Sequence, residues 1–178
     1  MKEISFEKLE SGNFNIYSLD QFNRYQETLV NLRLVNGSYI YVDEPFVETW
    51  NATQLREKAQ NILNAIALGC IGFIAKYNKQ VIGFAYLGHK ILGSEKQYID
   101  LIMFHVSNEF RNKGIGKRMF NLICDEARKL PVKKIYISSN SAKETQEAYR
   151  ALGCILATEV QTEIAVHEPL DIQLEYIL

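Results

Sequence analysis

The chain has 178 residues, 47% of them hydrophobic and 23% charged, and a chain of this length buries about 70% of the surface that its unfolded form exposes. Its 20 basic and 21 acidic residues give a formal net charge of −1, without the basic excess that nucleic-acid binding normally requires. The composition, with three Pro, ten Gly and no low-complexity tract, argues against disorder and predicts one globular domain over residues 1–178.

The N-terminus carries charge through its first ten residues and offers no apolar core for a secretory signal. The longest uncharged run, Ala59 to Ala75, is shorter than the roughly 20 apolar residues of a membrane-spanning helix. We therefore expect a cytoplasmic protein with no membrane partner. Cys70, Cys124 and Cys154 are widely spaced and form no C-x-x-C pair, which favours reduced core thiols over a metal or disulfide role.

Periodicity in the first seventy residues predicts three elements. Alternating apolar residues indicate a strand over Glu3–Leu9, and Leu19–Arg24 is compatible with a short helix. A longer helix is expected from a cap at Thr53 to about Leu68, with Gly69 at its end.

The segment between these two helices contains a turn signal. Two β-rich runs, Leu29–Val35 and Ser38–Val42, flank Asn36-Gly37. Asn-Gly is the strongest short-range signal for a β-hairpin because both residues tolerate positive φ. A helix continuing from Gln21 is the alternative for this stretch.

The rest of the chain alternates strands with two helices. The expected strands are Ile71–Lys76, Val81–Leu87, Tyr98–Val106, Ile135–Ser138, Ile155–Val160 and Ile172–Leu178. The expected helices are Gly114–Lys129, before Pro131, and Ala142–Leu152, before Gly153. A meander of strands followed by a β-α-β-α-β tail predicts an α+β fold.

The segment Phe104 to Gly116, FHVSNEFRNKGIG, carries the clearest chemical signal. A strand ends at Val106, a polar loop follows, and Gly114 and Gly116 stand where the next helix begins. Free backbone N–H groups and the positive end of a helix dipole meet there, without β-carbons to keep a ligand away. This arrangement predicts an anion site that suits a pyrophosphate, although the glycines could also form an ordinary turn.

Two motifs in the expected order resemble the GNAT family of N-acetyltransferases. The first is R-x-x-G-x-G from Arg111 to Gly116, and the second runs from the strand at Lys134–Ser138 to the helix end Ala148-Tyr149-Arg150-Ala151-Leu152-Gly153. The resemblance covers about Ile71 to Val160. It departs from the family pattern at Cys154, where an aromatic residue is commoner, and at Asn112. It implies a central mixed, mostly antiparallel sheet flanked by helices.

Other phosphate-binding motifs fit less well. A dinucleotide-binding fingerprint needs a third glycine, but Met119 stands in its place. A Walker loop is excluded because the sequence contains no G-K-[ST].

The resemblance implies acetyl-CoA as the co-substrate, with no metal. The main chain of the loop would hold the pyrophosphate, with charge added by Lys113, Lys117 and Arg118. The pantetheine arm would pair with the strand, and the Phe104 N–H would donate to the thioester carbonyl. The residues expected to bind acetyl-CoA are Phe104, Val106, Arg111, Asn112, Lys113, Gly114, Ile115, Gly116, Lys117, Asn140 and Tyr149.

Asp100, eleven positions before Arg111, stands where some family members carry a Glu that acts as general base through water. Strand alternation puts Asp100, Phe104 and Val106 on one face and His105 on the other, as a core or subdomain contact. Four strand residues span about 13 Å, so Asp100 would need a water bridge or a bent strand to reach the amine. A structural ion pair is the alternative role.

Tyr149 matches the tyrosine of the family and is the expected general acid, because an ordinary phenol is protonated at neutral pH. A core tyrosine is the alternative. Asn140 lies at the junction of strand and helix where the family contacts pantetheine, and a helix cap at Asn140 or Ser141 explains the pattern equally well.

The predicted activity is acetyl transfer from acetyl-CoA to the primary amine of a small molecule, by a monomer or homodimer. A noncatalytic acyl-CoA sensor and a protein or peptide N-acetyltransferase are the alternatives. Acidic residues hint at a cationic acceptor: Asp43, Glu44, Glu48, Glu163 and Glu168. The sequence contains no motif that identifies the acceptor.

Overall fold

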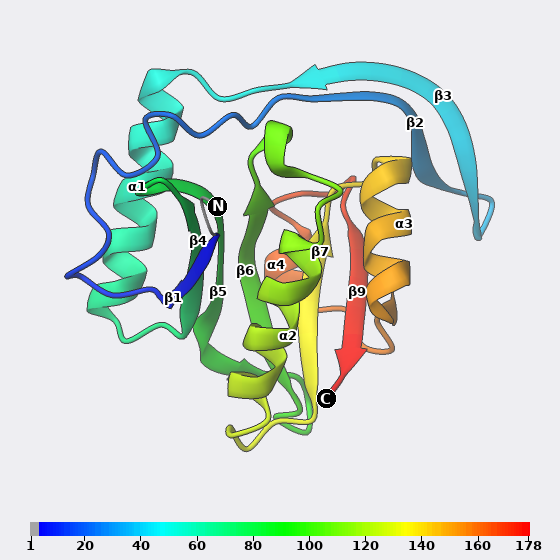
Figure 1. Cartoon of the computed structure of the whole chain (residues 1–178). Helices are drawn as coiled ribbons and strands as arrows, with labels where there is room; N and C mark the ends of the chain where they lie inside the picture. Colours follow the sequence, from blue (N-terminus) through cyan, green and yellow to red (C-terminus); the bar gives the residue numbers. More distant parts are fainter. Residues whose placement is uncertain (1–3) are drawn as a thin grey trace.

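The computed structural model describes residues 4–178. Its main element is a seven-stranded sheet in the order β1-β4-β5-β6-β7-β9-β8. All neighbouring pairs are antiparallel except β6 and β7, which run parallel. The helices α2 and α3 lie on one side of this sheet, and α1 and α4 lie on the other (Figure 1). The expected mixed, mostly antiparallel sheet flanked by helices is confirmed.

The elements follow the chain in this order: β1 (Ser5–Lys8), β2 (Gln26–Val35), β3 (Ser38–Glu48), α1 (Ala52–Ala67), β4 (Gly72–Tyr77), β5 (Gln80–Leu92), β6 (Tyr98–Val106), a 3₁₀ turn η1 (Asn108–Phe110), α2 (Ile115–Ala127), β7 (Lys134–Ser139), α3 (Lys143–Leu152), β8 (Ile155–Leu156), α4 (Thr162–Ala165) and β9 (Ile172–Ile177).

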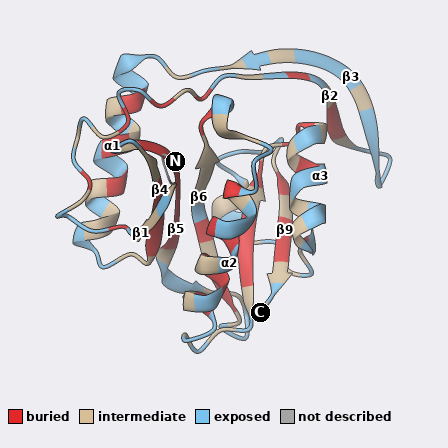
Figure 2. Cartoon of the chain, viewed as in Figure 1, coloured by how far each residue is buried: buried red, intermediate tan, exposed pale blue. Residues whose placement is uncertain are grey.

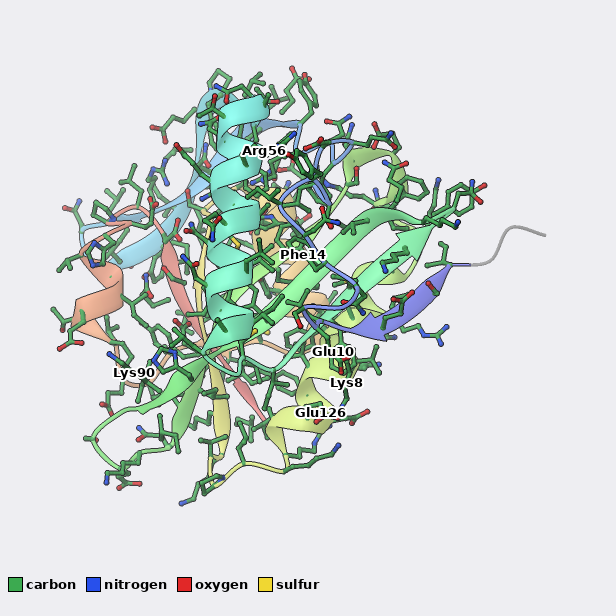
Figure 3. All side chains as sticks on the ribbon, turned by 90° about the vertical axis from the view of Figure 1, so that its left-hand side faces the viewer. Lys8, Glu10, Phe14, Arg56, Lys90 and Glu126 are labelled. Atoms are coloured by element: carbon green, nitrogen blue, oxygen red, sulfur yellow. The ribbon has the colours of Figure 1, made fainter. Side chains whose placement is uncertain are left out.

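Two apolar clusters pack on opposite faces of the sheet. The α2-side core joins buried side chains of α2, such as Met119, to inward side chains of β4, β5, β6, β7 and β9, such as Ile135. The α1-side core joins α1 to Phe84 and to the loop between β1 and β2, with Ile62 fully buried. Red buried segments therefore line the inner faces of α1, α2 and the central strands (Figure 2). Figure 3 views the molecule from the side of α1.

Most expected strands lie where the sequence places them, and Tyr98–Val106 agrees to the residue. Three expectations were wrong. The loop between β1 and β2 contains turns and no helix at Leu19–Arg24. The strand expected over Ile155–Val160 shortens to two residues. The first helix is capped by Asn51 in a capping box with Gln54, and Thr53 lies inside it. Of the first predicted strand, Glu3 lies outside the described residues.

The hairpin predicted at Asn36-Gly37 is confirmed, and the helical alternative is excluded. Asn36 and Gly37 have φ of 50° and 80°, as a two-residue hairpin turn requires. The strands β2 and β3 are longer than expected and form a separate two-stranded sheet. This ribbon crosses the top of the molecule and curves outward beyond α3 (Figure 1).

Candidate active site

The loop between β6 and α2 presents a row of unused backbone donors. Helix α2 begins after Gly114, whose φ of 78° is left-handed and strained for a residue with a β-carbon. The first backbone bond of the helix runs from the Arg118 N–H to the Gly114 carbonyl. The N–H groups of residues 112–117 donate to no acceptor within residues 4–178. The loop therefore has the geometry of an anion site at a helix N-terminus.

The Arg111 side chain turns into the protein rather than toward this row of donors. Its Nε donates to the Val106 carbonyl at 3.0 Å, and a terminal nitrogen donates to the Arg24 carbonyl at 3.3 Å. The guanidinium thus holds the loop in shape, and the anion site consists mainly of main-chain atoms.

The other cationic side chains near the loop differ in whether another group of the protein already contacts them. Lys113 donates to the Glu109 carbonyl at 2.8 Å, and the guanidinium of Arg118 lies over the Phe6 ring at 4.4 Å from its centroid. Lys117 is exposed and forms no ion pair within the described residues. Lys117 is therefore the cation best placed to add charge.

Gly116 lets the start of α2 approach β6 closely. A β-carbon at this position would lie 3.5 Å from the Phe104 ring and 3.8 Å from the Val106 side chain. The anion site is therefore adjacent to the end of β6, where the sheet opens.

The strands β6 and β7 diverge after a short contact. They pair only from Tyr98 with Lys134 to Asp100 with Tyr136, although β6 continues to Val106 and β7 to Ser139. Beyond Asp100, the edge of β6 that faces β7 has no strand partner among the described residues. An extended ligand can pair with such an edge.

The main chain of Phe104 is directed into this opening. The Ser107 N–H donates to the Ile82 carbonyl of β5 at 2.8 Å. The pairing of β5 with β6 keeps this register from Ser107 back to Phe104. Residues of an antiparallel strand alternate in the direction of their N–H and C=O groups. Phe104 and Val106 consequently turn these groups away from β5 and toward β7.

Tyr149 of α3 lies next to the opening, on the α2 side of the sheet. Its ring is 6.0 Å from that of Phe104, in an edge-to-face arrangement, and is half-buried. Its hydroxyl forms no hydrogen bond with another described residue. Burial, together with Cys154 and Asp171, raises the pKa of this phenol, so it stays protonated at neutral pH.

A bulge in β6 reverses the alternation expected from the sequence. Met103 lies opposite Tyr86, but Leu101 lies opposite the next residue, Leu87, so Ile102 has no partner. An extra residue in one strand moves all following side chains to the other face.

Asp100 therefore does not share a face with Phe104 and Val106, and the expectation based on parity was wrong. Leu101, Phe104 and Val106 all pack in or against the α2-side core, whereas Asp100 points to the opposite face with Tyr86. Burial raises the pKa of Asp100 to about 7, and its carboxylate forms no ion pair or hydrogen bond within residues 4–178.

A chain of polar side chains follows β7 and β9 on the same face as Asp100. Tyr136 donates to Gln173 at 2.6 Å, Gln173 donates to Ser138 at 3.1 Å, and Ser138 donates to Asp171 at 3.1 Å. Burial raises the pKa of Asp171 to about 6, with Glu168 and Glu48 adding repulsion. Nothing in the local sequence singles out these residues, because the sheet register alone brings them together.

The ion pair between Arg24 and Glu48 spans the mouth of the opening. Arg24 is buried and meets Glu48 at 2.5 Å. On the β6 side, the Arg24 carbonyl accepts from Arg111. On the β7 side, Glu48 accepts from the Asn140 amide at 3.3 Å. This clamp of Arg24 and Glu48 links the two diverging strands, and sequence reasoning missed Arg24.

Asn140 lies at the end of β7, as expected, and its amide oxygen accepts from the Ala142 N–H at 2.8 Å. The N-cap of α3 is Ala142, so the alternative account of Asn140 or Ser141 as the helix cap is not found. His105 packs against Trp50 and Phe84, and burial lowers its pKa to about 3. It is a neutral core side chain.

A second hollow, of about 430 Å³, lies at the far end of α2. Lys8, Glu10 and Glu126, labelled in Figure 3, are among its lining residues. Its position at the C-terminal end of the helix separates it from the row of free donors.

Three further observations concern metal ligands, membrane-spanning helices and thiols in residues 4–178. No group of three or more His, Cys, Asp or Glu side chains there is placed to hold a metal ion. Within the same residues, no helix has the length and apolar character needed to cross a bilayer. The three cysteines are free thiols.

Comparison with known proteins connects this geometry to a family. The profile described as "Acetyltransferase (GNAT) family" matches residues 37–154. No curated protein matches the sequence. Nourseothricin acetyltransferase has a similar structure, with a TM-score of 0.72, 14% identity and 98% coverage of both chains.

Two further solved structures are similar. A Bacillus anthracis str. Ames protein named as a streptothricin acetyltransferase, in complex with acetyl coenzyme A, has a TM-score of 0.68 and 16% identity over 99% of this chain and 98% of that one. An aminoglycoside 6'-N-acetyltransferase complexed with coenzyme A has a TM-score of 0.54 and 15% identity, covering 68% of this chain and 79% of that one.

Proposed function

Since this chain belongs to the GNAT family of acetyltransferases, we propose that it transfers the acetyl group of acetyl-CoA to the primary amine of a small cationic molecule. One observation carries the proposal: the free N–H groups of residues 112–117 stand beside the opening between β6 and β7. One part of the site suits a pyrophosphate and the other an extended arm.

The chain's own atoms fit such a ligand. The main chain from Asn112 to Lys117 would bind the pyrophosphate, with the start of the α2 dipole adding positive potential. Arg111 would act by holding the loop. The Phe104 carbonyl and the Val106 N–H would pair with the pantetheine amides, and Asn140 lies at the opposite side of the opening.

The Phe104 N–H would also stabilise the negative charge that develops on the thioester oxygen when the amine attacks the carbonyl carbon. It points into the opening and needs no rearrangement to donate. Loss of one such donor typically costs on the order of 3 kcal/mol of transition-state stabilisation.

Two side chains would transfer protons, one as the donor and one as the acceptor. When the carbon–sulfur bond breaks, the electron pair leaves with sulfur, and Tyr149 would protonate the thiolate because its hydroxyl is protonated and unpaired. Asp100 would take the proton that the amine loses, through bridging water. With a pKa of about 7 it can accept a proton near neutral pH.

The face of the sheet around Asp100 favours a cationic acceptor. Asp100 and Asp171 both stand on this face, and Glu48 lies near Asp171. A second ammonium group on the acceptor would be attracted to Asp171 while the reacting amine faces Asp100. The names of two structural neighbours, which refer to nourseothricin and to aminoglycosides, support a small-molecule acceptor.

A thiol-release assay with acetyl-CoA tests the proposal. The acceptor panel contains polyamines, aminoglycosides, amino acids and a peptide of matched length. We expect turnover with acceptors that carry two or more amines, and little with neutral amino acids. Turnover with the peptide alone would identify a peptide acetyltransferase. Binding of acetyl-CoA without turnover on any acceptor would identify a sensor.

A further inference from the structure

Ile102 is an exposed apolar residue in the middle of the main sheet. Within β6, all of which the structure describes, it is the one exposed residue, and its side chain is 47% exposed. The strand itself lies between β5 and β7, well inside the sheet (Figure 1). Single exposed apolar residues are common on protein surfaces, so the significance of Ile102 depends on its position.

Ile102 lies on the same face of the sheet as Asp100. Leu87 packs in the α2-side core, so the next residue of β5, Gly88, faces away from α2. A β-carbon at Gly88 would lie 3.3 Å from the Ile102 side chain, which places this side chain on the face away from α2. Asp100 points to that face as well. Because Gly88 has no side chain, it leaves room there for Ile102.

Ile102 separates the two groups that act on the amine in the proposed reaction. Asp100, the proposed proton acceptor, precedes it by two residues, and Phe104, whose N–H would face the thioester oxygen, follows it by two. Four strand residues span about 13 Å. The space between Asp100 and Phe104 must therefore hold the reacting amine, the bridging water and the part of the acceptor next to the amine. Ile102 lies beside this space.

Ser138 and Asp171 lie across the opening from Ile102. The last parallel pair of β6 and β7 is Asp100 with Tyr136, and Ile102 and Ser138 each follow this pair by two residues. Ser138 shares the face of Tyr136, because alternate residues of a strand point the same way. The Ser138 hydroxyl donates to Asp171 at 3.1 Å. An apolar group on one side of the opening therefore faces an acidic group on the other.

These two surfaces favour an acceptor that carries a hydrocarbon chain between two amino groups. A methylene chain that packs on the isoleucine side chain leaves water at a gain in free energy. The hydroxyls of an amino sugar at the same place would lose hydrogen bonds to water and find no donor or acceptor on Ile102. Asp171, which forms no ion pair within residues 4–178, would bind the second ammonium.

We propose that Ile102 determines the specificity for the acceptor by binding the methylene chain next to the reacting amine. The acceptor class is then an alkyl diamine rather than an amino sugar. This role rests on the proposed acetyl transfer, because the thioester and Asp100 define where the chain lies. Ile102 cannot transfer a proton, so it acts on the binding of the acceptor and not on the chemical step.

Steady-state kinetics with acetyl-CoA and a series of amines tests the proposal. The series contains diaminopropane, diaminobutane and diaminopentane, together with deoxystreptamine, a diamine whose amino groups are joined by a hydroxylated ring. In the wild type, we expect kcat/KM to rise roughly threefold with each added methylene. With deoxystreptamine it should be about tenfold or more below the value for diaminopentane.

Three variants show whether Ile102 causes this preference. In Ile102→Ser, KM for diaminopentane should rise about tenfold, so that the dependence on methylene number disappears, while KM for deoxystreptamine changes by less than about twofold. Ile102→Val keeps most of the apolar surface and should retain most of the dependence. Ile40→Ser, at a position that is 45% exposed on β3, is the matched control and should behave like the wild type. Thermal unfolding verifies that each variant is folded.

The outcomes distinguish a failure of this role from a failure of the proposed function. A wild type that acetylates no amine of the series would overturn both. Turnover that is independent of methylene number would overturn the role of Ile102 alone, and so would a preference for deoxystreptamine. Losses of equal size with diaminopentane and deoxystreptamine in Ile102→Ser would also overturn it, because they would reflect a disturbed strand and not a lost contact.

Discussion

Tyr149 and Asp100 stand on opposite faces of the sheet, and the opening between β6 and β7 connects them. Tyr149 lies beside Phe104 on the α2 side, whereas the bulge at Ile102 turns Asp100 to the other side. A cofactor and an acceptor could therefore enter from different faces and meet at Phe104. The proton donor and the proton acceptor would then act without competing for the same space.

Replacement of Tyr149 by phenylalanine tests its role as general acid. Tyr149→Phe keeps the ring and removes a hydroxyl that has no hydrogen-bond partner among the described residues, so the variant should fold normally. We expect kcat to fall by about 10²- to 10⁴-fold while the affinity for CoA changes little. Tyr17→Phe, at an exposed and distant tyrosine, serves as the control. Unaltered turnover of Tyr149→Phe would show that Tyr149 contributes to packing and not to proton transfer.

Replacement of Asp100 by asparagine should affect activity in a pH-dependent way. If Asp100 accepts the proton of the amine, Asp100→Asn should lower kcat/KM by about 10²-fold or more near pH 7. The defect should shrink at high pH, where the acceptor amine is already deprotonated. A defect of equal size at all pH values would contradict the role of general base.

The same substitution should stabilise the protein at high pH. The folded-state pKa of Asp100, about 7, lies above its usual 3.8, so the native state retains a proton that the unfolded chain has lost. Stability therefore falls as the pH rises from about 4 to 7, and Asp100→Asn escapes this loss. We expect a gain of roughly 1 to 3 kcal/mol at pH 8 and none at pH 3, measured by urea unfolding.

At the scale of elements, the N-terminus of α2 can be tested at Gly116. Gly116 is the better position because its backbone is helical, whereas Gly114 has a positive φ and any side chain there is strained. Gly116→Val places a branched side chain against Phe104 and Val106, next to the free donors at the start of α2. We expect KM for acetyl-CoA to rise at least tenfold, with little change in kcat.

Acetyl-pantetheine, which lacks the pyrophosphate, separates two explanations of this result. If the loop binds phosphate, Gly116→Val should leave the KM for acetyl-pantetheine nearly unchanged. Equal losses with both substrates would mean that the new side chain only disturbs Phe104. Gly12→Val is the matched control, since a β-carbon at Gly12 meets no atom within 4 Å.

The clamp of Arg24 and Glu48 provides a second test at this scale. Glu48→Gln removes the charge that faces buried Arg24 while it keeps an oxygen for Asn140. We expect KM for acetyl-CoA to rise several-fold, because the ends of β6 and β7 lose their link, and the protein to lose about 1 to 3 kcal/mol of stability. Glu44→Gln breaks the more exposed pair with Arg33 and should cost less than 1 kcal/mol. Identical effects of the two substitutions would argue against the clamp.

At the scale of the whole molecule, the ligand should stabilise the fold. A ligand that binds only the native state adds about 2.7 kcal/mol at a hundredfold excess over its Kd, which for a chain of this size raises Tm by roughly 5 to 10 °C. We expect this shift with acetyl-CoA and none with NAD or ATP at equal concentration, measured by thermal unfolding. A rise in Tm with NAD and none with acetyl-CoA would contradict the proposed acetyltransferase activity.

Two predictions about the whole molecule stay predictions: that residues 1–178 form one domain, and that the protein is cytoplasmic. Solved structures that match 98% or more of this chain support the first, because they extend the similarity beyond residues 37–154.

Local sequence was sufficient for the features that depend on neighbours along the chain. Asn36-Gly37 predicted the hairpin because its dihedral preferences are local. Gly114 and Gly116 predicted the row of free donors because helix starts leave their first N–H groups unpaired. The match of Tyr149 to its motif likewise placed this residue on a helix that packs next to Phe104.

Only the tertiary structure decided features that depend on register and on distant segments. The bulge at Ile102 moved Asp100 to the opposite face, because one extra residue reverses strand alternation and this bulge has no sequence signature. Asp171 reached the site through the pairing of β9 with β7. Arg24 met Glu48 across the hairpin. The sequence shows that these side chains are present. Their directions are determined by the packing of the whole sheet, which no local pattern reveals.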